Sequence, residues 1–366
     1  MTAAPSPPRC RDLGIAPGSM APGPLNAITD VAGVGVGQVT LIEGEAVRTG
    51  VTAITPHAGN PFQEKTPAGF ASGNGFGKFA GSTQIEELGE IETPIVLTNT
   101  LSVADALAGA ISWTLARPGN GRVVSVNAVV GETNDGYLND IRGRHVSPAH
   151  VVQAIAAASS GPVAEGCVGA GTGTQAFGWK GGIGTSSRLA AGFTLGVLVQ
   201  TNYGGSLCVD GVAVGRQLLP PPRVREGEGD GSVVVVLATD APLSERNLAR
   251  LARRAFLGLA RTGSWMANGS GDYAIAFSAA ESVRRTPSRR KSAGPYPDLA
   301  NEAMSPLFQA AVEATEEAVL NAMLQAVTTR GMNGRVLHAI PAAELRRIVR
   351  AQRPEAPPAA GTHESG

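Results

Sequence analysis

The sequence predicts a layered α/β or α+β fold in which sheets pack against helices. Several β-branched runs follow one another without an intervening helix, which is typical of layered sheets and not of a doubly wound fold. Other segments carry apolar residues at helical spacing or begin with a helix-start signal. The 366 residues, 43% of them hydrophobic, suffice for a core that needs no disulfide bonds. The length alone would also allow two domains.

Strands are expected in both halves of the chain. β-Branched or apolar runs predict them at residues 28–31, 34–41, 51–55, 95–98, 123–130, 193–200, 232–238 and 273–278. The run at 232–238 is continuously apolar and indicates a buried strand. Residues 57–76 are polar and rich in Gly and Pro, so no regular element is expected there. Within them, the run from Gly73 to Gly77 lacks the flanking residues of a phosphate-binding loop and is interpreted as a turn.

Helices are expected at residues 102–115, 147–159, 244–258 and 305–327. In the third of these, leucines and alanines share one face and arginines line the others. Ser147 and Ser244 are candidate N-caps for the second and third helices. The Pro-rich residues 219–231 and the basic residues 282–297 are expected to form exposed loops.

Charge, cysteine content and hydropathy argue against several classes of function. Lys plus Arg and Asp plus Glu both number 30, so there is no global electrostatic reason to expect a nucleic-acid partner. The three cysteines show no CxxC spacing and the five histidines are dispersed, so no disulfide framework, metal site or cofactor is indicated. Neither a secretory signal nor an apolar run of membrane-spanning length is visible. A soluble, cytoplasmic protein without a membrane partner is therefore expected.

Residues 261–272 (Arg-Thr-Gly-Ser-Trp-Met-Ala-Asn-Gly-Ser-Gly-Asp) carry the strongest chemical signal. Ser270 directly follows Gly269, so its hydroxyl could attack the preceding carbonyl. Cutting that bond would leave Ser270 as an N-terminal residue that carries both a nucleophile and an amine. The structural alternative is a β-hairpin turn, because Asn-Gly is a strong turn signal, and on the motif alone this turn is favoured. Ser264, which follows Gly263, is a second candidate nucleophile.

Other polar residues could carry chemistry, and each also has a structural interpretation. Glu132 could hold a substrate ammonium at a strand end or be a surface carboxylate, and Tyr137 could line the same pocket or pack within a loop. Asn202 could donate to an oxyanion or be a turn residue. Thr315 and Glu317 lie on the last expected helix, where glutamates are more often solvated. No sequence pattern brings these segments together.

Five motifs resemble, in their order along the chain, the self-cleaving N-terminal-nucleophile aminopeptidases typified by the L-aminopeptidase/D-esterase DmpA and the β-peptidyl aminopeptidases. The motifs are Asn-Ala-Ile-Thr-Asp-Val at 26–31, Val-Gly-Glu-Thr-Asn-Asp-Gly-Tyr-Leu-Asn-Asp at 130–140, Gln-Thr-Asn-Tyr-Gly at 200–204, residues 249–278 including Asn-Gly-Ser-Gly-Asp at 268–272, and Ala-Thr-Glu-Glu-Ala-Val-Leu-Asn-Ala-Met at 314–323. The resemblance extends from about Asn26 to Gly334. Several motifs in one order are more specific than any single motif, so the hairpin-only interpretation loses favour.

The resemblance implies a DmpA-like, four-layered αββα sandwich in a single hydrolase domain at residues 26–335. An N-terminal arm at 1–25 would precede this domain, and the Pro/Ala-rich tail at 354–366 is expected to be disordered. The resemblance also implies a precursor that cuts itself into an α-chain of residues 1–269 and a β-chain from Ser270. Several cleaved αβ units would then assemble. Substrates would be small peptides, amino-acid amides or esters with L-, D- or β-residues, and no metal or cofactor would take part.

Roles follow residue by residue from the matching motifs. By resemblance, Ser270 is the nucleophile, Asn202 supplies an oxyanion donor, and Glu132 faces the free amino group of the substrate. Thr315 and Glu317 match a hydroxyl residue and a glutamate of the family, and the proton of the Ser270 hydroxyl would go either to the Ser270 amine or to this pair.

Two alternatives stay open at this point. Glu316 could take the place of Glu317, because the basic loop before this helix makes the match less secure. In function, the chain could be an unprocessed, catalytically silent relative that acts as a binding or scaffold protein.

Overall fold

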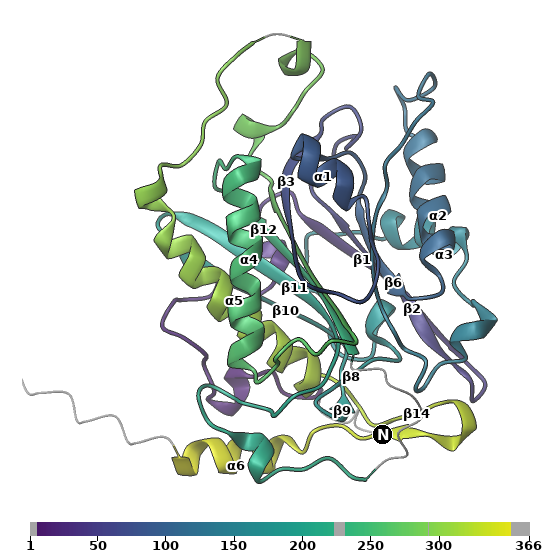
Figure 1. Cartoon of the computed structure of the whole chain (residues 1–366), viewed down its shortest axis with the longest axis vertical. Helices are drawn as coiled ribbons and strands as arrows, with labels where there is room; N and C mark the ends of the chain where they lie inside the picture. The colour runs from purple at the N-terminus through teal and green to yellow at the C-terminus, as the bar shows by residue number, and fades with distance from the viewer. Residues whose placement is uncertain (1–5, 223–230, 292, 353–366) are drawn as a thin grey trace, which may run out of the picture.

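The computed structural model describes residues 6–222, 231–291 and 293–352. Two β-sheets pack face to face, and a layer of helices covers the outer face of each sheet (Figure 1). This confirms the four-layered αββα sandwich. The loop expected at 219–231 lies partly outside the described residues, and the tail at 354–366 lies entirely outside them.

The smaller sheet has the strand order β1-β2-β6-β7-β4. Its strands are β1 (Gly35–Glu43), β2 (Val47–Thr55), β6 (Ile95–Asn99), β7 (Val129–Thr133) and β4 (Phe79–Ala80). β1 and β2 run antiparallel, whereas β6 and β7 are parallel. Helices α2 (Val103–Leu115) and α3 (Pro148–Ala156) cover its outer face, on the right of Figure 1.

The larger sheet has the order β5-β3-β13-β12-β11-β8-β9, with β10 also paired to β11. Its strands are β5 (Glu90–Ile91), β3 (Thr66–Gly75), β13 (Ser270–Ser278), β12 (Gly231–Thr239), β11 (Phe193–Tyr203), β8 (Gln175–Ala176), β9 (Trp179–Lys180) and β10 (Ile183–Ala190). On β12, Val233 and Val235 face the helix layer while Val234 and Val236 face the other sheet. Burial on both faces explains why this strand is a continuous apolar run.

Helices α4 (Glu245–Arg261) and α5 (Ser305–Leu324) cover the outer face of the larger sheet. Ser244 caps α4, because its hydroxyl accepts a hydrogen bond from Asn247 N at 3.4 Å. The remaining elements are α1 (Ser82–Leu88), α6 (Ala342–Gln352), a small sheet of β14 (Thr329–Arg330) and β15 (Val336–Leu337), and short 3-10 helices at Arg11–Leu13, Ile28–Asp30, Ile141–Gly143, Gly169–Gly171, Val214–Arg216, Glu281–Val283, Arg289–Lys291, Asn301–Ala303 and Met332–Gly334. No helix of the described residues is long and apolar enough to cross a membrane.

Three expectations for local structure were wrong. Residues 28–31 form a 3-10 turn and not a strand, because the Asp30 carboxylate accepts from Leu25 N (2.9 Å) and Ala27 N (3.1 Å). Residues 57–76 do contain a strand, β3. Its Gly69 fits tightly against α4, since an added Cβ would lie 2.1 Å from Ala249 N.

The third error concerns the β-branched run at 123–130. Only its last two residues belong to β7, and Val124 is 99% exposed. A β-branched composition favours a strand only where a neighbouring strand and a core face are present.

Candidate active site

The candidate nucleophile lies at the edge of the larger sheet that is formed by strand ends, where β13 and β12 begin and β11 ends. Ser270 is the first residue of β13 and pairs with Gly231, the first residue of the parallel strand β12. The antiparallel strand β11 ends at the same edge, where Asn202 pairs with Ser232 and Tyr203 pairs with Gly231. The sheet therefore brings Ser270 and Asn202 to the same edge, two strands apart.

Ser270 is buried and its hydroxyl has a defined acceptor. Ser270 Oγ donates a hydrogen bond to Asp272 Oδ1 at 2.8 Å, since residues i and i+2 of a strand share one face. Burial raises the pKa of the Asp272 carboxyl to about 6, and the hydrogen bond from Ser270 opposes part of that rise. Among the described residues, Asp272 Oδ2 has no hydrogen-bond partner. This carboxylate is thus positioned to take the proton of the Ser270 hydroxyl.

The bond before Ser270 lies in a tight turn. Ser270 N donates to Ala267 O at 2.9 Å, which closes a turn with Asn268 and Gly269 at its centre. The expected Asn-Gly turn is therefore present, but the β-hairpin interpretation is wrong. β13 pairs with β12 and β3, both distant in sequence, and the element before the turn is α4.

Asn74 on β3 holds the backbone on both sides of this bond. Its Nδ2 atom donates to Ala267 O at 3.1 Å and to Asn268 O at 3.0 Å, and it also contacts Ser270 O. Asn74 faces Asp272 across the sheet. From the sequence alone this residue is interpreted as part of a turn, because no local pattern reveals a cross-strand partner nearly two hundred residues away.

Glu132 lies close to the backbone that follows the nucleophile. Its carboxylate accepts from Lys78 N at 3.0 Å and from the Thr100 hydroxyl. A Cβ added to Gly77 would lie 3.2 Å from both Glu132 Oε1 and Gly271 Cα, so this glycine allows β13 and Glu132 to approach each other. Glu132 is therefore brought to the Ser270 region, as the sequence-based hypothesis requires.

Polar groups of β7, β12 and β11 continue from Glu132 toward Asn202. Asn134 N, at the end of β7, donates to Ser232 Oγ at 3.3 Å, and Ser232 lies opposite both Asn202 and Gly271 in the sheet. We call these residues the polar row: Glu132, Asn134, Ser232, Asn202 and Gly271. Strand alternation directs the Ser270 and Asp272 side chains to the opposite, helix-facing side. No hydrogen bond joins Ser270 Oγ to Asn202 or Glu132 in the described part of the chain.

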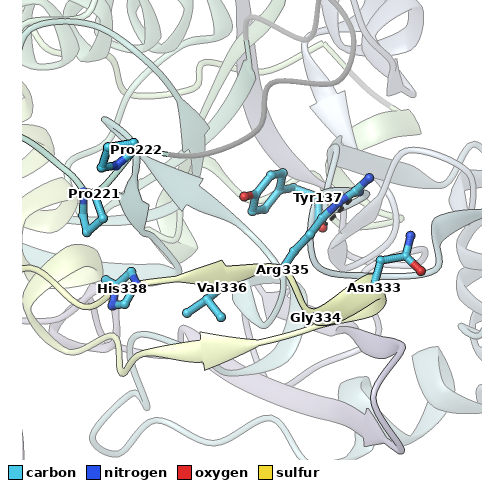
Figure 2. Close-up of a pocket in the computed structure, with 9 residues that line it drawn as sticks. Tyr137, Pro221, Pro222, Asn333, Gly334, Arg335, Val336 and His338 are labelled. Atoms are coloured by element: carbon cyan, nitrogen blue, oxygen red, sulfur yellow. Dashed lines mark hydrogen bonds between the residues drawn. The ribbon is translucent and has the colours of Figure 1, made fainter.

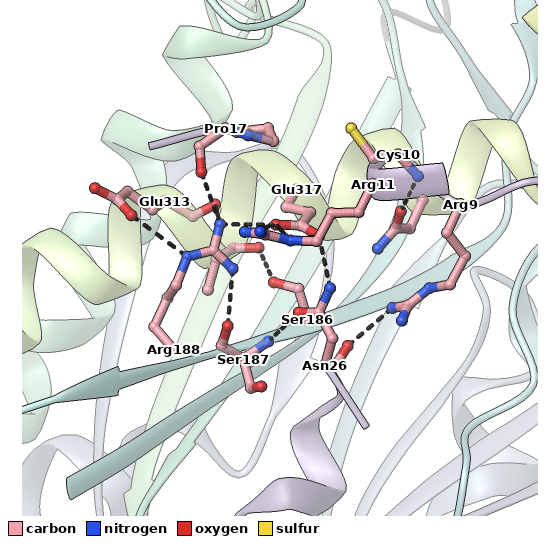
Figure 3. A network of polar contacts seen from close by, with 12 residues as sticks. Arg9, Cys10, Arg11, Pro17, Asn26, Ser186, Ser187, Arg188, Glu313 and Glu317 are labelled. Carbon is pink, nitrogen blue, oxygen red and sulfur yellow. Dashed lines mark hydrogen bonds and ion pairs between the residues drawn. The ribbon is translucent and has the colours of Figure 1, made fainter. Parts of the chain in front are cut away.

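Two other expected residues, Thr315 and Glu317, make no hydrogen bond to Ser270 among the described residues. Thr315 is buried where α5 crosses α4, and a Cβ added to Gly258 would lie 2.7 Å from its Cβ. Within the described residues, the Thr315 hydroxyl has no hydrogen-bond partner. The Glu317 carboxylate accepts from Arg188 (2.8 Å), Arg11 (2.9 Å) and Asn26 (2.6 Å), as Figure 3 shows. Their catalytic roles stay predictions from the resemblance.

Glu316, the alternative to Glu317, contacts the stretch that leads to Ser270. Its carboxylate pairs with Arg261, the last residue of α4, at 2.5 Å, and accepts from Asp210 N at 3.2 Å. The alternative nucleophile Ser264 is held by backbone contacts. Ser264 N donates to Leu259 O at 3.3 Å and Ser264 Oγ accepts from Met266 N at 3.4 Å.

Tyr137 lines a separate cavity of about 330 Å³ (Figure 2). Arg335 lies over its ring at 5.5 Å and donates to the Tyr137 carbonyl oxygen at 3.4 Å. Neither Ser270 nor any residue of the polar row lines this cavity. No group of three or more His, Cys, Asp or Glu side chains that could hold a metal ion occurs among the residues that the structure describes.

Comparisons with known proteins agree with this architecture. The sequence model of peptidase family S58 matches residues 26–337 of the chain. The chain is 43% identical to the β-peptidyl aminopeptidase BapA of Sphingosinicella microcystinivorans, over 94% of this chain and 93% of that protein. Among solved structures, a β-aminopeptidase from a Burkholderia species is 43% identical with a TM-score of 0.87, covering 95% of this chain and all of that one.

A further solved structure is the L-aminopeptidase D-Ala-esterase/amidase of Ochrobactrum anthropi, described as a prototype of the serine aminopeptidases and a variant of the Ntn-hydrolase fold. It is 40% identical to the chain with a TM-score of 0.86, and the match covers 94% of this chain and 98% of that one.

Proposed function

The chain belongs to peptidase family S58, and we propose that it is a serine aminopeptidase that matures by cutting its own backbone between Gly269 and Ser270. The observation that carries this proposal is the hydrogen bond from the buried Ser270 hydroxyl to Asp272, directly after a turn. Substrates are small peptides, amino-acid amides or esters with a free amino group. Relatives named for β-peptidyl, L-aminoacyl and D-alanyl substrates support this class.

Self-cleavage proceeds by transfer of the Gly269 acyl group from nitrogen to oxygen. Ser270 Oγ attacks the Gly269 carbonyl carbon while its proton passes to Asp272. The tetrahedral adduct collapses with loss of the C–N bond, the leaving nitrogen takes up the proton, and an ester joins Gly269 to Ser270 Oγ. Water hydrolyses the ester and leaves a Ser270 amine. Asn74 supports this step because it restrains the carbonyls on either side of the bond.

Aminopeptidase turnover uses the freed Ser270. Once its amide is an amine, the hydrogen bond to Ala267 O no longer fixes the residue, and its hydroxyl can turn toward the polar row. The substrate ammonium pairs with Glu132, Ser270 Oγ attacks the scissile carbonyl, and the Ser270 amine accepts the proton. Asn202 Nδ2 donates to the developing oxyanion. The adduct collapses with loss of the scissile bond, and the Ser270 ammonium gives its proton to the leaving amine or alcohol. Water then hydrolyses the acyl-enzyme and restores the Ser270 hydroxyl.

The rate of self-cleavage should depend on pH through Asp272. Only the ionised carboxylate accepts the Ser270 proton, and the Asp272 pKa is about 6. We therefore expect the first-order rate of processing to rise about tenfold per pH unit below pH 6 and to level off above pH 7. Freshly refolded precursor followed on denaturing gels at pH 4.5–8 measures this. In Asp272→Asn, processing should be slow and lose this pH dependence, whereas a flat wild-type profile would exclude Asp272 as the base.

Glu132→Gln should weaken turnover without affecting maturation. The neutral amide keeps the shape but loses the charge-assisted hydrogen bond to the substrate ammonium, which is worth roughly 1.5–3 kcal/mol, or about 10- to 100-fold in kcat/KM. Self-cleavage involves no substrate ammonium, so the variant should process at the wild-type rate. Steady-state kinetics on an L-aminoacyl amide and a β-homo-aminoacyl amide provide the test. An unchanged kcat/KM on both substrates would refute this role for Glu132.

A further inference from the structure

Lys180 is a fully buried cation that the proposed mechanism does not use. Its ammonium donates to three backbone carbonyls, Thr174 O and Gly181 O at 2.8 Å and Gly171 O at 3.0 Å. A buried charge is costly unless each of its hydrogen atoms has an acceptor. All three acceptors lie in residues 171–181, beside the end of β11 that carries Asn202. The ammonium therefore fixes the shape of a loop next to the candidate oxyanion donor.

One peptide group connects Lys180 to Asn202. Its carbonyl, Thr174 O, accepts from Lys180 Nζ at 2.8 Å and from Gly181 N at 3.2 Å. Its N–H, on Gln175, donates to Asn202 Oδ1 at 3.2 Å. In a planar trans peptide the C=O and N–H point in opposite directions, so holding the carbonyl also aims the N–H. A positive charge on the carbonyl side also polarises the peptide and strengthens its donor.

This contact determines which way the Asn202 amide faces. A backbone N–H can only donate, so the Asn202 atom that faces Gln175 N must be the acceptor Oδ1. The donor Nδ2 then points away from Gln175, and in the described part of the chain it makes no hydrogen bond of its own. In the reverse orientation Asn202 Nδ2, which is also a donor, would face the Gln175 N–H. Asn202 is thus held with its NH₂ group available to an oxyanion.

Gly181 makes this arrangement possible. A Cβ at this position would lie 2.6 Å from Gln175 C and 2.6 Å from Thr201 Oγ1, so only glycine lets the loop close on β11. Thr201 secures the same approach, because its hydroxyl accepts from Gly182 N at 3.0 Å. These contacts hold the loop against β11 at Thr201, the residue directly before Asn202.

We propose that Lys180 is a positioning residue for the reaction, acting through the Thr174–Gln175 peptide to orient the Asn202 amide toward the oxyanion. The proposal rests on the proposed role of Asn202. Removal of the oxyanion donor itself lowers kcat by roughly 100- to 1,000-fold. Loss of its orientation should cost less, and we expect a fall of about 10-fold in kcat with KM nearly unchanged.

A double-mutant cycle tests this on the full-length, processed protein. In a wild-type background, Lys180→Met should lower kcat, and in an Asn202→Ala background it should lower kcat no further. Lys65→Met serves as the matched control. Lys65 is partly buried in an ion pair with Glu92, so its loss destabilises the fold without contact to Asn202, and kcat should not change.

Each outcome has a distinct meaning. If the fall in kcat of the double variant Lys180→Met/Asn202→Ala equals the product of the falls in the two single variants, the positioning role is overturned. A wild-type kcat in Lys180→Met would overturn it as well. A wild-type kcat in Asn202→Ala would instead refute the proposed oxyanion donor. If Lys180→Met does not fold, Lys180→Gln retains an uncharged donor at this position. It should show a smaller fall in kcat that again disappears in the Asn202→Ala background, and a fall that persists there would count against the proposal.

Discussion

Ser270→Ala should remain a single uncleaved chain of 37.2 kDa and hydrolyse no aminoacyl amide above background. Without the hydroxyl, neither the acyl transfer from Gly269 nor the acyl-enzyme can form. Loss of a serine nucleophile lowers kcat by about 10⁶-fold in a serine peptidase that has been dissected in this way. Wild-type protein should instead give bands of about 27 and 10 kDa, in proportion to residues 1–269 and 270–366.

Two controls accompany this variant on the same denaturing gel and in the same amidase assay. Ser264→Ala should process and turn over like the wild type, because within the described residues Ser264 hydrogen-bonds to backbone groups and not to a carboxylate. Asp272→Glu retains a carboxylate and should process more slowly than the wild type but to completion. A cleaved Ser270→Ala chain would show that another residue cuts the backbone.

The second large effect concerns stability. Arg188→Met should lower the free energy of unfolding by up to about 3–5 kcal/mol, because it removes the fully buried partner of the Glu317 carboxylate. Arg188 is fully buried and pairs with Glu317 at 2.8 Å and Glu313 at 3.4 Å (Figure 3). Arg11 still binds Glu317 but is partly exposed. Urea unfolding followed by circular dichroism measures the difference.

Arg347→Met is the matched control for Arg188→Met. Arg347 pairs with Glu344 on the exposed face of α6, where solvent screens the interaction, so the unfolding midpoint should not change. An equally stable Arg188→Met variant would show that the buried ion pairs of Arg188 add no net stability to the fold.

Urea unfolding and steady-state kinetics together separate two roles for Glu317. The contacts of Glu317 with Arg188 and Asn26 favour a structural role. In that case Glu317→Gln is less stable than the wild type, but each folded molecule has the wild-type kcat. The catalytic role implied by resemblance predicts the opposite, with a fall in kcat at unchanged stability.

The sequence singles out Ser270 as the candidate nucleophile because its signal is local: a hydroxyl directly after glycine in a turn. It also identified the layered fold, since runs such as 232–238 are apolar where both faces are buried. The sequence shows a carboxylate at Asp272 but indicates no role for it, because the apolar run predicts a strand that begins at 273. A start at Ser270 would have placed residues 270 and 272 on one face.

Other parts of the site have no local signature. Asn74 and Lys180 act through backbone groups that are close only in the folded chain, so neither spacing nor residue type reveals them. Glu317 was assigned by motif alone. Its partner Arg11 lies in the Pro- and Gly-rich N-terminal segment, for which only an irregular arm was expected.

The intact masses of the chains in purified wild-type protein test the central claim most directly. Self-cleavage before Ser270 predicts two chains, with a β-chain whose mass and N-terminal residue correspond to a start at Ser270 and an α-chain that ends at Gly269. A β-chain that begins at Ser264 would contradict the assignment of the nucleophile. A single intact chain that hydrolyses aminoacyl amides would contradict maturation by self-cleavage, and an intact chain without activity would favour a binding or scaffold role.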